Sequence, residues 1–339
     1  MSTAARPVVL YSESRYADDS VEKEILGKDM TVRWRDVDDV SDLKPEDCAD
    51  VEGLMVMRHG VTAADFKKFP KLRCVVRMGV GYDKVDRKAA EAHGVMVCNV
   101  PDYGTTEVAD HAMALALSLR RGVLLHHEAQ RRPQPAPWRF ILDPLVKRSG
   151  VQTFGIIGLG RIGTAVALRA KAFQFNVVVF DPHMPNGTEL GVGVKRVRKL
   201  EELMEQTDTL SIHAPLTPET RGMVSRDMME RMPKGAIVVN TARGPIVDVD
   251  ALADLLKRGH LAGAGLDVLP IEPPVDPIPE ILRAYRAREP WTEGRLVITP
   301  HSAFHTPNAE MDTRIKAAET IRAALLTSSP QNVITPDMF

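Results

Sequence analysis

GIIGLGRIG, residues 155–163, is the most informative stretch of this sequence. It carries the spacing G-x-G-x-x-G on Gly158, Gly160 and Gly163, between an apolar run that predicts a strand and an alanine-rich run that predicts a helix. The first glycine allows a tight turn, the second lets backbone approach a pyrophosphate, and the third lets the helix pack on the strand. The helix N-terminus offers N–H groups to the phosphates. In this context a dinucleotide-binding turn is a better hypothesis than an ordinary glycine-rich turn.

A carboxylate stands at the end of the next predicted strand. That strand leads into Asp181, about 20 residues beyond the glycines, where a ribose hydroxyl is expected in such domains. Asp181 would accept hydrogen bonds from the ribose, and its charge would repel a 2′-phosphate. The sequence therefore favours NAD over NADP as the cofactor.

The length and composition bound the class of protein. A chain of 339 residues predicts two domains, and 44% hydrophobic residues provide ample core. A net charge of -1 gives no reason to expect binding to nucleic acid or to a membrane. The three cysteines are widely spaced, no Cys/His cluster has metal-ligand spacing, and no apolar run is as long as a membrane helix. We expect a cytoplasmic protein with buried thiols and without a signal peptide or a metal site.

The N-terminal part of the chain alternates short β-branched runs with polar or helical stretches. This alternation predicts parallel strands with helical crossovers, and so a small α/β domain. The expected strands cover residues 8–11, 31–34, 53–57, 74–77 and 95–99. A long helix is expected next, at residues 105–130, and its start is apolar nearly all round, which indicates burial on more than one side.

The later part of the chain predicts a larger sheet. Six strands are expected, at residues 154–157, 177–180, 209–213, 236–240, 263–268 and 296–299. They predict one doubly wound parallel sheet, the Rossmann fold. Residues 271–293 predict a long irregular insertion, and residues 195–199 predict a solvated charged face beside a helix. The last helix, residues 309–326, follows the completed sheet and is expected to return to the first domain.

These elements give a division into two domains. We predict a smaller, flavodoxin-like α/β substrate-binding domain that is discontinuous in sequence, at residues 1–106 and 304–339. The NAD-binding Rossmann domain is predicted at residues 107–303 and includes the long helix. Ligands of open α/β sheets bind beyond the carboxyl ends of the strands, so polar residues at those ends are the candidates for chemistry.

Three such candidates lie in the second domain: Arg243, Glu272 and His301. Arg243 can hold a carboxylate or carbonyl oxygen through a charge-assisted contact. His301 can give a proton to a carbonyl oxygen as hydride arrives from the nicotinamide, a role that contributes about 10²–10⁴-fold. Glu272 can accept from the other ring nitrogen and favour the imidazolium. Together they predict reduction of an α-keto acid, although each residue alone also fits an ordinary surface or loop position.

The first domain offers candidates by the same argument. The glycine-rich turn at residues 77–83 follows a strand and exposes backbone N–H groups that suit a carboxylate. Arg77 could equally be a structural arginine that forms an ion pair at the end of its strand. His59 and His305 lie near strand ends, but for both a structural role is the simpler hypothesis. A site between the two domains would close by a hinge motion that excludes water.

Several stretches together resemble the D-isomer-specific 2-hydroxyacid dehydrogenase family, over nearly the whole chain. They are residues 76–83 (VRMGVGYD), 155–163, 211–217 (SIHAPLT), 239–244 (VNTARG), 266–273 (LDVLPIEP) and 299–301 (TPH). Within the family the chain is similar to the branch of C-terminal binding proteins, through residues 98–101, residues 169–173 and the ending after Ile334. Residues 302–305, Ser-Ala-Phe-His, depart from that branch.

The resemblance implies roles for individual residues. It implies an NAD-dependent enzyme that forms a homodimer through the helix near residues 105–130, with Arg243, Glu272 and His301 as the catalytic trio. The implied substrate contacts are Arg77, Val80, Gly81 and Phe304. The implied cofactor contacts are Gly158, Gly160, Arg161, Ile162, Asp181, His213, Ala214, Pro215, Thr220, Thr241, Ala242, Arg243, Asp267 and His301.

Two functions follow from these residues. The first is an NAD-dependent D-2-hydroxyacid dehydrogenase, or 2-keto acid reductase, that acts on glyoxylate, hydroxypyruvate or a bulkier 2-oxo acid. The second is an NAD(H)-sensing dimeric corepressor or scaffold with little turnover, for which a nuclear location is also expected. The trio favours the enzyme, but the corepressor branch keeps the same trio, so the sequence leaves both open. A formate dehydrogenase would carry glutamine where Glu272 stands.

Overall fold

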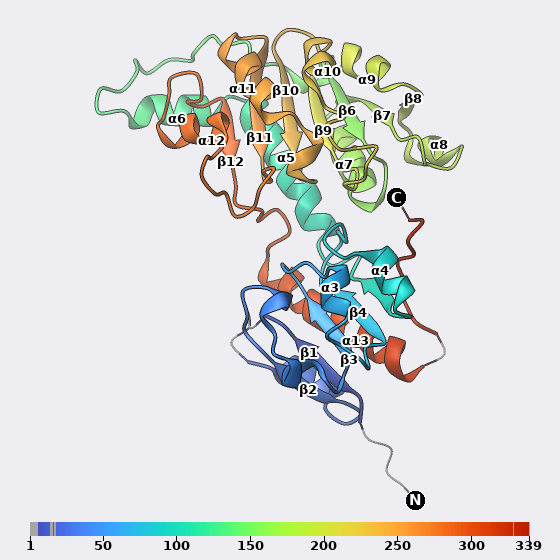
Figure 1. Ribbon diagram of the computed structural model, residues 1–339. Helices are drawn as coiled ribbons and strands as arrows, with labels where there is room; N and C mark the ends of the chain where they lie inside the picture. The colour runs from blue at the N-terminus through green and yellow to red at the C-terminus, as the bar shows by residue number, and fades with distance from the viewer. Residues whose placement is uncertain (1–5, 14–15, 17, 328, 339) are drawn as a thin grey trace, which may run out of the picture. The chain divides into compact units, whose positions relative to one another are not determined.

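The structure is a computed structural model of the chain, and it describes residues 6–13, 16, 18–327 and 329–338. The chain divides into two compact units: unit 1 comprises Met1–Gly104 and His305–Phe339, and unit 2 comprises Thr105–Phe304. Each unit is built on one parallel sheet, so the predicted α/β class is confirmed (Figure 1). None of the described helices is long and apolar enough to span a membrane.

Unit 1 contains a five-stranded sheet in the order β2-β1-β3-β4-β5, with every pair parallel. Its strands are β1 (Val8–Tyr11), β2 (Thr31–Trp34), β3 (Val51–Val56), β4 (Cys74–Arg77) and β5 (Met96–Asn99). Its helices are α1 (Ser20–Leu26), the short helix Val40–Asp42, α2 (Pro45–Cys48), α3 (Ala63–Phe66), α4 (Arg87–Ala92) and α13 (Pro307–Leu326). This strand order is the flavodoxin-like form of the doubly wound sheet.

Helix α13 completes unit 1 from the end of the chain (Figure 1). The hydroxyl of Thr306 caps it by accepting the N–H of Ala309 at 3.0 Å. The helix packs on β3, where a side chain at Gly53 would lie 2.9 Å from Ile321. A separate apolar core joins the sheet to α2, α3 and α4. Both faces of this sheet are therefore covered, which is why the domain needs the C-terminal helix.

Unit 2 contains a seven-stranded sheet in the order β12-β11-β10-β9-β6-β7-β8, again with every pair parallel. Its strands are β6 (Thr153–Ile157), β7 (Asn176–Phe180), β8 (Lys195–Val197), β9 (Thr209–Ile212), β10 (Ala236–Asn240), β11 (Leu261–Leu266) and β12 (Leu296–Ile298). The order reverses between β6 and β9, and such a switch point is where doubly wound sheets bind their ligands.

Helices cover both faces of this sheet (Figure 1). One face packs on α5 (Thr105–Arg120) and α7 (Arg161–Ala172), whose alanine-rich stripes allow close contact. The other face shares its core with α9 (Leu200–Gln206), α10 (Arg226–Glu230), α11 (Val249–Lys257) and α12 (Glu280–Arg286). The remaining helices are α6 (Val123–Arg131), α8 (Thr188–Val192) and the short helices Ser149–Val151 and Gly244–Ile246.

A buried arginine anchors the C-terminal end of α5. Arg120 donates to the hydroxyl of Thr209 at 3.0 Å, to the carbonyl of Gly235 at 3.0 Å and to the carbonyl of Asp208. Burial lowers the pKa of Arg120 to about 10, so the guanidinium stays charged at neutral pH. Because these acceptors lie at the amino ends of β9 and β10, the whole of α5 is fixed against the sheet.

The prediction of a single long helix at residues 105–130 is wrong. The structure has α5 and α6 instead, separated at Gly122, whose φ is 61°. Left-handed backbone ends one helix and redirects the chain, and glycine adopts it without strain. A side chain at Gly122 would also lie 2.7 Å from Val146. The apolar pattern runs across this break and therefore hides it.

Two further expectations are corrected in unit 2. Residues 195–199 were expected to be a charged face beside a helix, but Lys195–Val197 form β8, the seventh strand of a sheet expected to have six. Lysine and arginine are common on such edge strands. The insertion at residues 271–293 is not wholly irregular, because it contains α12, where Ile281 joins the core.

Candidate active site

The glycine turn after β6 has the close contacts that its spacing predicts. Gly158 has a φ of 88°, and a side chain there would lie 2.9 Å from the backbone nitrogen of Ala214. A side chain at Gly163 would collide with the carbonyl of Gly158. Only glycine avoids strain and collision at these positions, so the turn and α7 can approach the loop after β9.

The space before α7 suits an anionic group. Gly160 is the N-cap of α7, and a Cβ at this position would have no neighbouring atom within 4 Å. Arg161 and Ile162 open this helix, whose first N–H groups are therefore available to phosphate. At the end of β10 the hydroxyl of Thr241 is buried without a hydrogen-bond partner among the described residues. Such a group is costly unless a ligand completes it, so the residues fit a dinucleotide.

Asp181 lies at the carboxyl end of β7, beside the glycine turn. Its Oδ2 accepts the N–H of Leu159 at 2.9 Å. Its Oδ1 accepts the N–H groups of His183 at 2.9 Å and Met184 at 3.1 Å. The guanidinium of Arg196 donates to the Asp181 carbonyl at 2.8 Å. The carboxylate is thus held in the place where the sequence predicts a ribose contact.

His301 and Glu272 are in direct contact. The Nδ1 of His301 lies 2.6 Å from the Oε2 of Glu272, and the side chains are 39% and 30% exposed. The other carboxylate oxygen accepts the N–H of Leu269 at 2.7 Å. Partial burial would raise the pKa of Glu272, but the hydrogen bond and charge of His301, the Leu269 N–H and the charge of Arg243 outweigh burial and lower it. An ionised Glu272 accepts Nδ1–H and leaves Nε2 of His301 for a substrate.

Arg243 lies in a turn at the end of β10 that Asn240 shapes. The buried side-chain amide of Asn240 donates to the carbonyl of Arg243 at 2.9 Å and accepts the N–H of Ala242 at 3.0 Å. A side chain at Gly244 would collide with the loop after β11. Arg243 is half-buried, and its charge acts on Glu272. The structure therefore brings the trio to one edge of the sheet, with Asn240 as a support that the sequence analysis did not identify.

Phe304 contacts the ring of His301, and Asp267 holds the residues that follow it. The ring of Phe304 is 6.2 Å from the ring of His301, edge to face. Asp267 is buried, and its carboxylate accepts the N–H groups of Ser302 and Ala303. An aromatic ring in contact with His301 is compatible with the substrate contact predicted for Phe304. The carboxylate of Asp267 accepts three hydrogen bonds, from Thr299, Ser302 and Ala303, which leaves about one acceptor site for the predicted cofactor contact.

The other predicted substrate residues lie in unit 1. The guanidinium of Arg77, at the end of β4, folds over Gly79, where a side chain would collide with it. The side-chain amide of Asn99 donates to the carbonyl of Val80 at 2.7 Å. The turn that continues through Gly81 is therefore fixed from β5. Its part in substrate binding stays a prediction.

The loop after β9 carries further predicted cofactor contacts. His213 follows the strand, and its Nε2 lies 2.8 Å from the hydroxyl of Ser211. Burial lowers the pKa of His213 to about 3, so the imidazole is neutral at physiological pH. The hydroxyl of Thr220 donates to the carbonyl of Pro215 at 2.7 Å and closes the turn. The neutral imidazole of His213 therefore adds no charge of its own beside Ala214.

Two more histidines lie near strand ends. In unit 1 the Nδ1 of His59 lies 3.1 Å from the hydroxyl of Ser12 and 3.7 Å from Glu13, and all three residues are buried. The exposed His305 has its Nε2 3.7 Å from Glu310. A buried cluster and a surface ion pair both fit the structural roles that we expect for these histidines.

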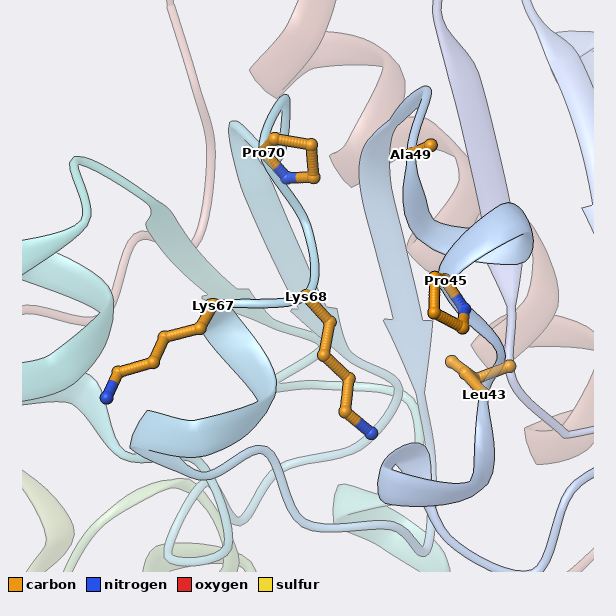
Figure 2. A pocket seen from close by; sticks show the side chains of 6 residues that line it. All are labelled: Leu43, Pro45, Ala49, Lys67, Lys68 and Pro70. Carbon is orange, nitrogen blue, oxygen red and sulfur yellow. The ribbon is translucent and has the colours of Figure 1, made fainter.

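Unit 1 also has a surface depression of about 550 Å³. Figure 2 shows Lys67 and Lys68 on one side of it and Leu43, Pro45 and Ala49 on the other, with the Lys67 side chain pointing away from these three. Its lining residues are Leu43, Pro45, Ala49, Lys67, Lys68 and Pro70. No residue of the trio lines it. In the part of the chain that the structure describes, no group of three or more His, Cys, Asp or Glu side chains is placed to hold a metal ion.

The fold and the site define a nicotinamide-dependent dehydrogenase with two α/β units. Residues 113–303 match the model of the D-isomer specific 2-hydroxyacid dehydrogenase family, NAD binding domain, and the chain belongs to this family. It is 36% identical over 287 residues to the glyoxylate reductase of Korarchaeum cryptofilum, a match that covers 82% of this chain and 80% of that protein. The family predicted from the sequence is therefore confirmed, and with it an oxidoreductase that acts on the CH–OH group of 2-hydroxy acids.

Two solved structures extend this similarity. One is an NADPH-dependent glyoxylate/hydroxypyruvate reductase from Sinorhizobium meliloti with NADP and malonate, 29% identical, with 97% of each chain covered and a TM-score of 0.82. The other is a D-lactate dehydrogenase from Aquifex aeolicus with NAD and lactic acid, 27% identical, with 93% of this chain and 94% of that chain covered and a TM-score of 0.78. Because the first holds NADP and the second NAD, these comparisons indicate a nicotinamide cofactor without selecting one.

Proposed function

We propose that this protein is an NAD-dependent D-2-hydroxyacid dehydrogenase that reduces a small 2-keto acid. The observation that carries this proposal is the 2.6 Å contact between His301 and Glu272, on the sheet that also carries the glycine turn. Arg243 lies in the turn that follows β10, the strand next to β11. A proton donor, its orienting carboxylate and a fixed cation are the groups that carbonyl reduction needs.

Each residue of the trio has a different role at the substrate carbonyl. The nicotinamide, when bound, supplies a hydride to C2. Glu272 accepts Nδ1–H of His301, so Nε2–H is the group that gives its proton to the carbonyl oxygen, and in the oxidative direction neutral Nε2 takes the hydroxyl proton. Arg243 binds the substrate oxygen through a charge-assisted hydrogen bond of about 1.5–3 kcal/mol.

Turnover by the purified protein tests this proposal. NADH oxidation is measured against glyoxylate, hydroxypyruvate, pyruvate and larger 2-oxo acids, for the wild type and for His301→Ala. We expect turnover on at least one acid, lowered by about 10² or more in the variant. If NADH binds and no acid is reduced, the enzyme proposal fails and the NAD(H)-sensing scaffold becomes the leading function. Peptide binding without turnover would support that second function.

Asp181 supports the choice of NAD. A carboxylate has about four acceptor sites, and the backbone occupies three of those on Asp181. One site remains for a ribose hydroxyl, while the negative charge disfavours a 2′-phosphate. In Asp181→Asn, which keeps the size and one acceptor oxygen, the ratio of kcat/KM with NADH to that with NADPH should fall about tenfold or more, equivalent to about 1.4 kcal/mol. An unchanged ratio would contradict this assignment.

We also propose a homodimer formed by unit 2. The segment after α6 leaves three large apolar side chains exposed, Trp138 at 93%, Phe140 at 75% and Leu142 at 88%. Figure 1 shows this segment as an extended loop beyond α6. Such a concentration of exposed apolar residues is typical of an interface, and a second copy of the chain is the partner that the family resemblance implies. Sedimentation should give a dimer for the wild type and a larger monomer fraction for the variant W138S/L142S. A wild-type monomer would contradict the proposal.

A further inference from the structure

The backbone of His301 is strained. Its φ is 52°, in the left-handed region that residues other than glycine rarely adopt. Such a conformation persists only where the surrounding structure holds it, and it is common at functional sites. The N–H of His301 donates to the carbonyl of Asp267 at 2.8 Å and approaches the carbonyl of Thr299 at 3.1 Å. The catalytic side chain therefore depends on whatever fixes this turn.

The carboxylate of Asp267 holds the next two residues of the turn. Its Oδ1 accepts the N–H of Ser302 at 2.9 Å, and its Oδ2 accepts the N–H of Ala303 at 3.0 Å. Asp267 is 1% exposed. One buried residue thus holds the turn on both sides, through its carbonyl at His301 and through its carboxylate beyond it. The orientation of that carboxylate then sets the path of the backbone through His301.

Two side chains orient this carboxylate. The hydroxyl of Thr299 donates to Asp267 Oδ1 at 2.6 Å, and Nε2 of His111 lies 3.0 Å from the same hydroxyl. A hydroxyl has one hydrogen and a carboxylate can only accept, so that hydrogen belongs to the bond with Asp267. Nε2 of His111 must therefore carry a hydrogen and donate to Thr299. The result is a directed chain of hydrogen bonds from α5 to the catalytic turn.

We propose that His111, Thr299 and Asp267 are positioning residues that hold His301 in its strained, productive conformation. This inference rests on the proposed function, because it takes His301 as the proton donor. It gives Asp267 a role in holding the turn, in addition to the cofactor contact that the family resemblance implies. Neither His111 nor Thr299 touches the substrate in this assignment, and both act through Asp267.

The variants separate the hydrogen bonds from the volume of the side chains. Thr299→Val removes the hydroxyl at nearly constant size, and Thr299→Ser keeps it. His111→Leu removes the donor, and His111→Gln keeps an N–H donor near the position of Nε2. Thr292→Val is the control, since Thr292 is a buried threonine whose hydroxyl donates to the carbonyl of Glu289 at 2.8 Å, outside the turn.

Hydrogen exchange and kinetics are measured on the same preparations. In Thr299→Val and His111→Leu we expect faster amide exchange in the peptide that contains Ser302 and Ala303. We also expect kcat to fall between about 10- and 100-fold, the size of effect that a misplaced catalytic group produces. The KM for the keto acid and the affinity for NADH should stay close to the wild-type values. Thr299→Ser, His111→Gln and the control should resemble the wild type in both measurements.

Each contrary result overturns a defined part of the proposal. Unchanged amide exchange in Thr299→Val would refute the proposal that Thr299 holds the turn. Faster exchange with an unchanged kcat would refute the proposal that the turn positions His301. A loss of NADH affinity in place of kcat shows that the cluster serves the cofactor. An equal loss in Thr292→Val shows a general packing effect. If the wild type reduces no keto acid, the proposed function fails, while the exchange measurement still decides whether Thr299 and His111 hold the turn.

Discussion

In both units a histidine and a glutamate meet beyond the carboxyl ends of the strands. In unit 1, Nδ1 of His59 lies 3.7 Å from Glu13, and the two side chains are 6% and 4% exposed. In unit 2, Nδ1 of His301 lies 2.6 Å from Glu272, and both side chains are substantially exposed. The residue types and their places on the sheets are alike, so these alone do not separate a catalytic pair from a structural one.

The hydrogen bonds of the two carboxylates explain the difference. Oε1 of Glu13 accepts the N–H groups of Met57 at 2.8 Å, Arg58 at 2.6 Å and His59 at 3.2 Å, and Oε2 accepts Nε of Arg58 at 2.8 Å. Glu13 is therefore occupied in holding the loop after β3. Glu272 gives one oxygen to its own loop and the other to His301. A carboxylate with an oxygen committed to a histidine, at an exposed site, can support proton transfer.

The largest effect is expected for His301→Asn. The asparagine side chain can keep a polar atom near the position of Nδ1 and the contact with Glu272, but it has no counterpart of Nε2. We expect kcat for keto acid reduction to fall about 10³-fold, within the range of general-acid catalysis, with little change in thermal stability. The control is His93→Ala, at an exposed histidine at the end of α4. Activity within tenfold of the wild type would remove His301 from the mechanism.

The next effect concerns stability and Glu13. Burial opposes ionisation, but the hydrogen bonds from Arg58 and the backbone lower the pKa of Glu13 from 4.5 to about 2. Because this pKa is lower in the folded than in the unfolded protein, ionised Glu13 stabilises the fold above about pH 4.5, and the stabilisation is lost as the pH falls toward 2. At about 1.4 kcal/mol per pKa unit, Glu13→Gln should cost about 3 kcal/mol of unfolding free energy at pH 7.

Denaturant unfolding at several pH values checks this prediction. The difference between the wild type and Glu13→Gln should shrink as the pH falls through the range in which Glu13 takes up its proton. Glu24→Gln, at an exposed position of α1, is the control and should unfold like the wild type. A constant difference at all pH values would show that the loss comes from packing and not from the charge of Glu13.

A smaller effect is expected for Glu272→Gln. The variant keeps the shape of the side chain but removes the negative charge that accepts the Nδ1–H of His301. Because the proton donor itself remains, we expect kcat to fall between about 10- and 100-fold, less than for His301→Asn, as is typical for the loss of a residue that orients a histidine. Steady-state kinetics measure it, with Glu201→Gln, at an exposed position of α9, as the control. A loss larger than that of His301→Asn would contradict the order of roles.

The sequence was informative wherever the signal is local. The glycine spacing needs only nine neighbouring residues, 155–163, and strand ends are visible from apolar runs, so the Rossmann unit, the family and the three catalytic candidates could all be predicted. The edge strand β8 is short and charged and lacks such a run, so its residues predict a solvated face beside a helix and not a strand. The break at Gly122 depends on a φ that the apolar pattern does not record.

The residues that hold the candidate site in place cannot be predicted from the sequence, for a different reason. His111 and Thr299 are 188 residues apart in the chain, and nothing near either residue indicates the other. The same holds for Asn99, which fixes the turn at Val80 from a neighbouring strand. Asn240 acts locally, but its side chain could equally have faced solvent. Such contacts follow from the packing of whole elements, so the sequence predicts candidate groups for the chemistry but not the groups that hold them.

The smallest effect is expected for His59→Asn, the substitution in unit 1 that corresponds to His301→Asn in unit 2. His59→Asn keeps a polar atom near Nδ1, the atom that meets the Ser12 hydroxyl at 3.1 Å, and it removes only ring atoms. We expect a loss of about 1 kcal/mol in unfolding free energy, of the order of one hydrogen bond, and a kcat close to that of the wild type. Because the identical change at His301 should remove nearly all activity, the two variants measured side by side test the comparison directly. A large loss of kcat in His59→Asn, with normal stability, would mean that the buried pair of unit 1 also serves the reaction.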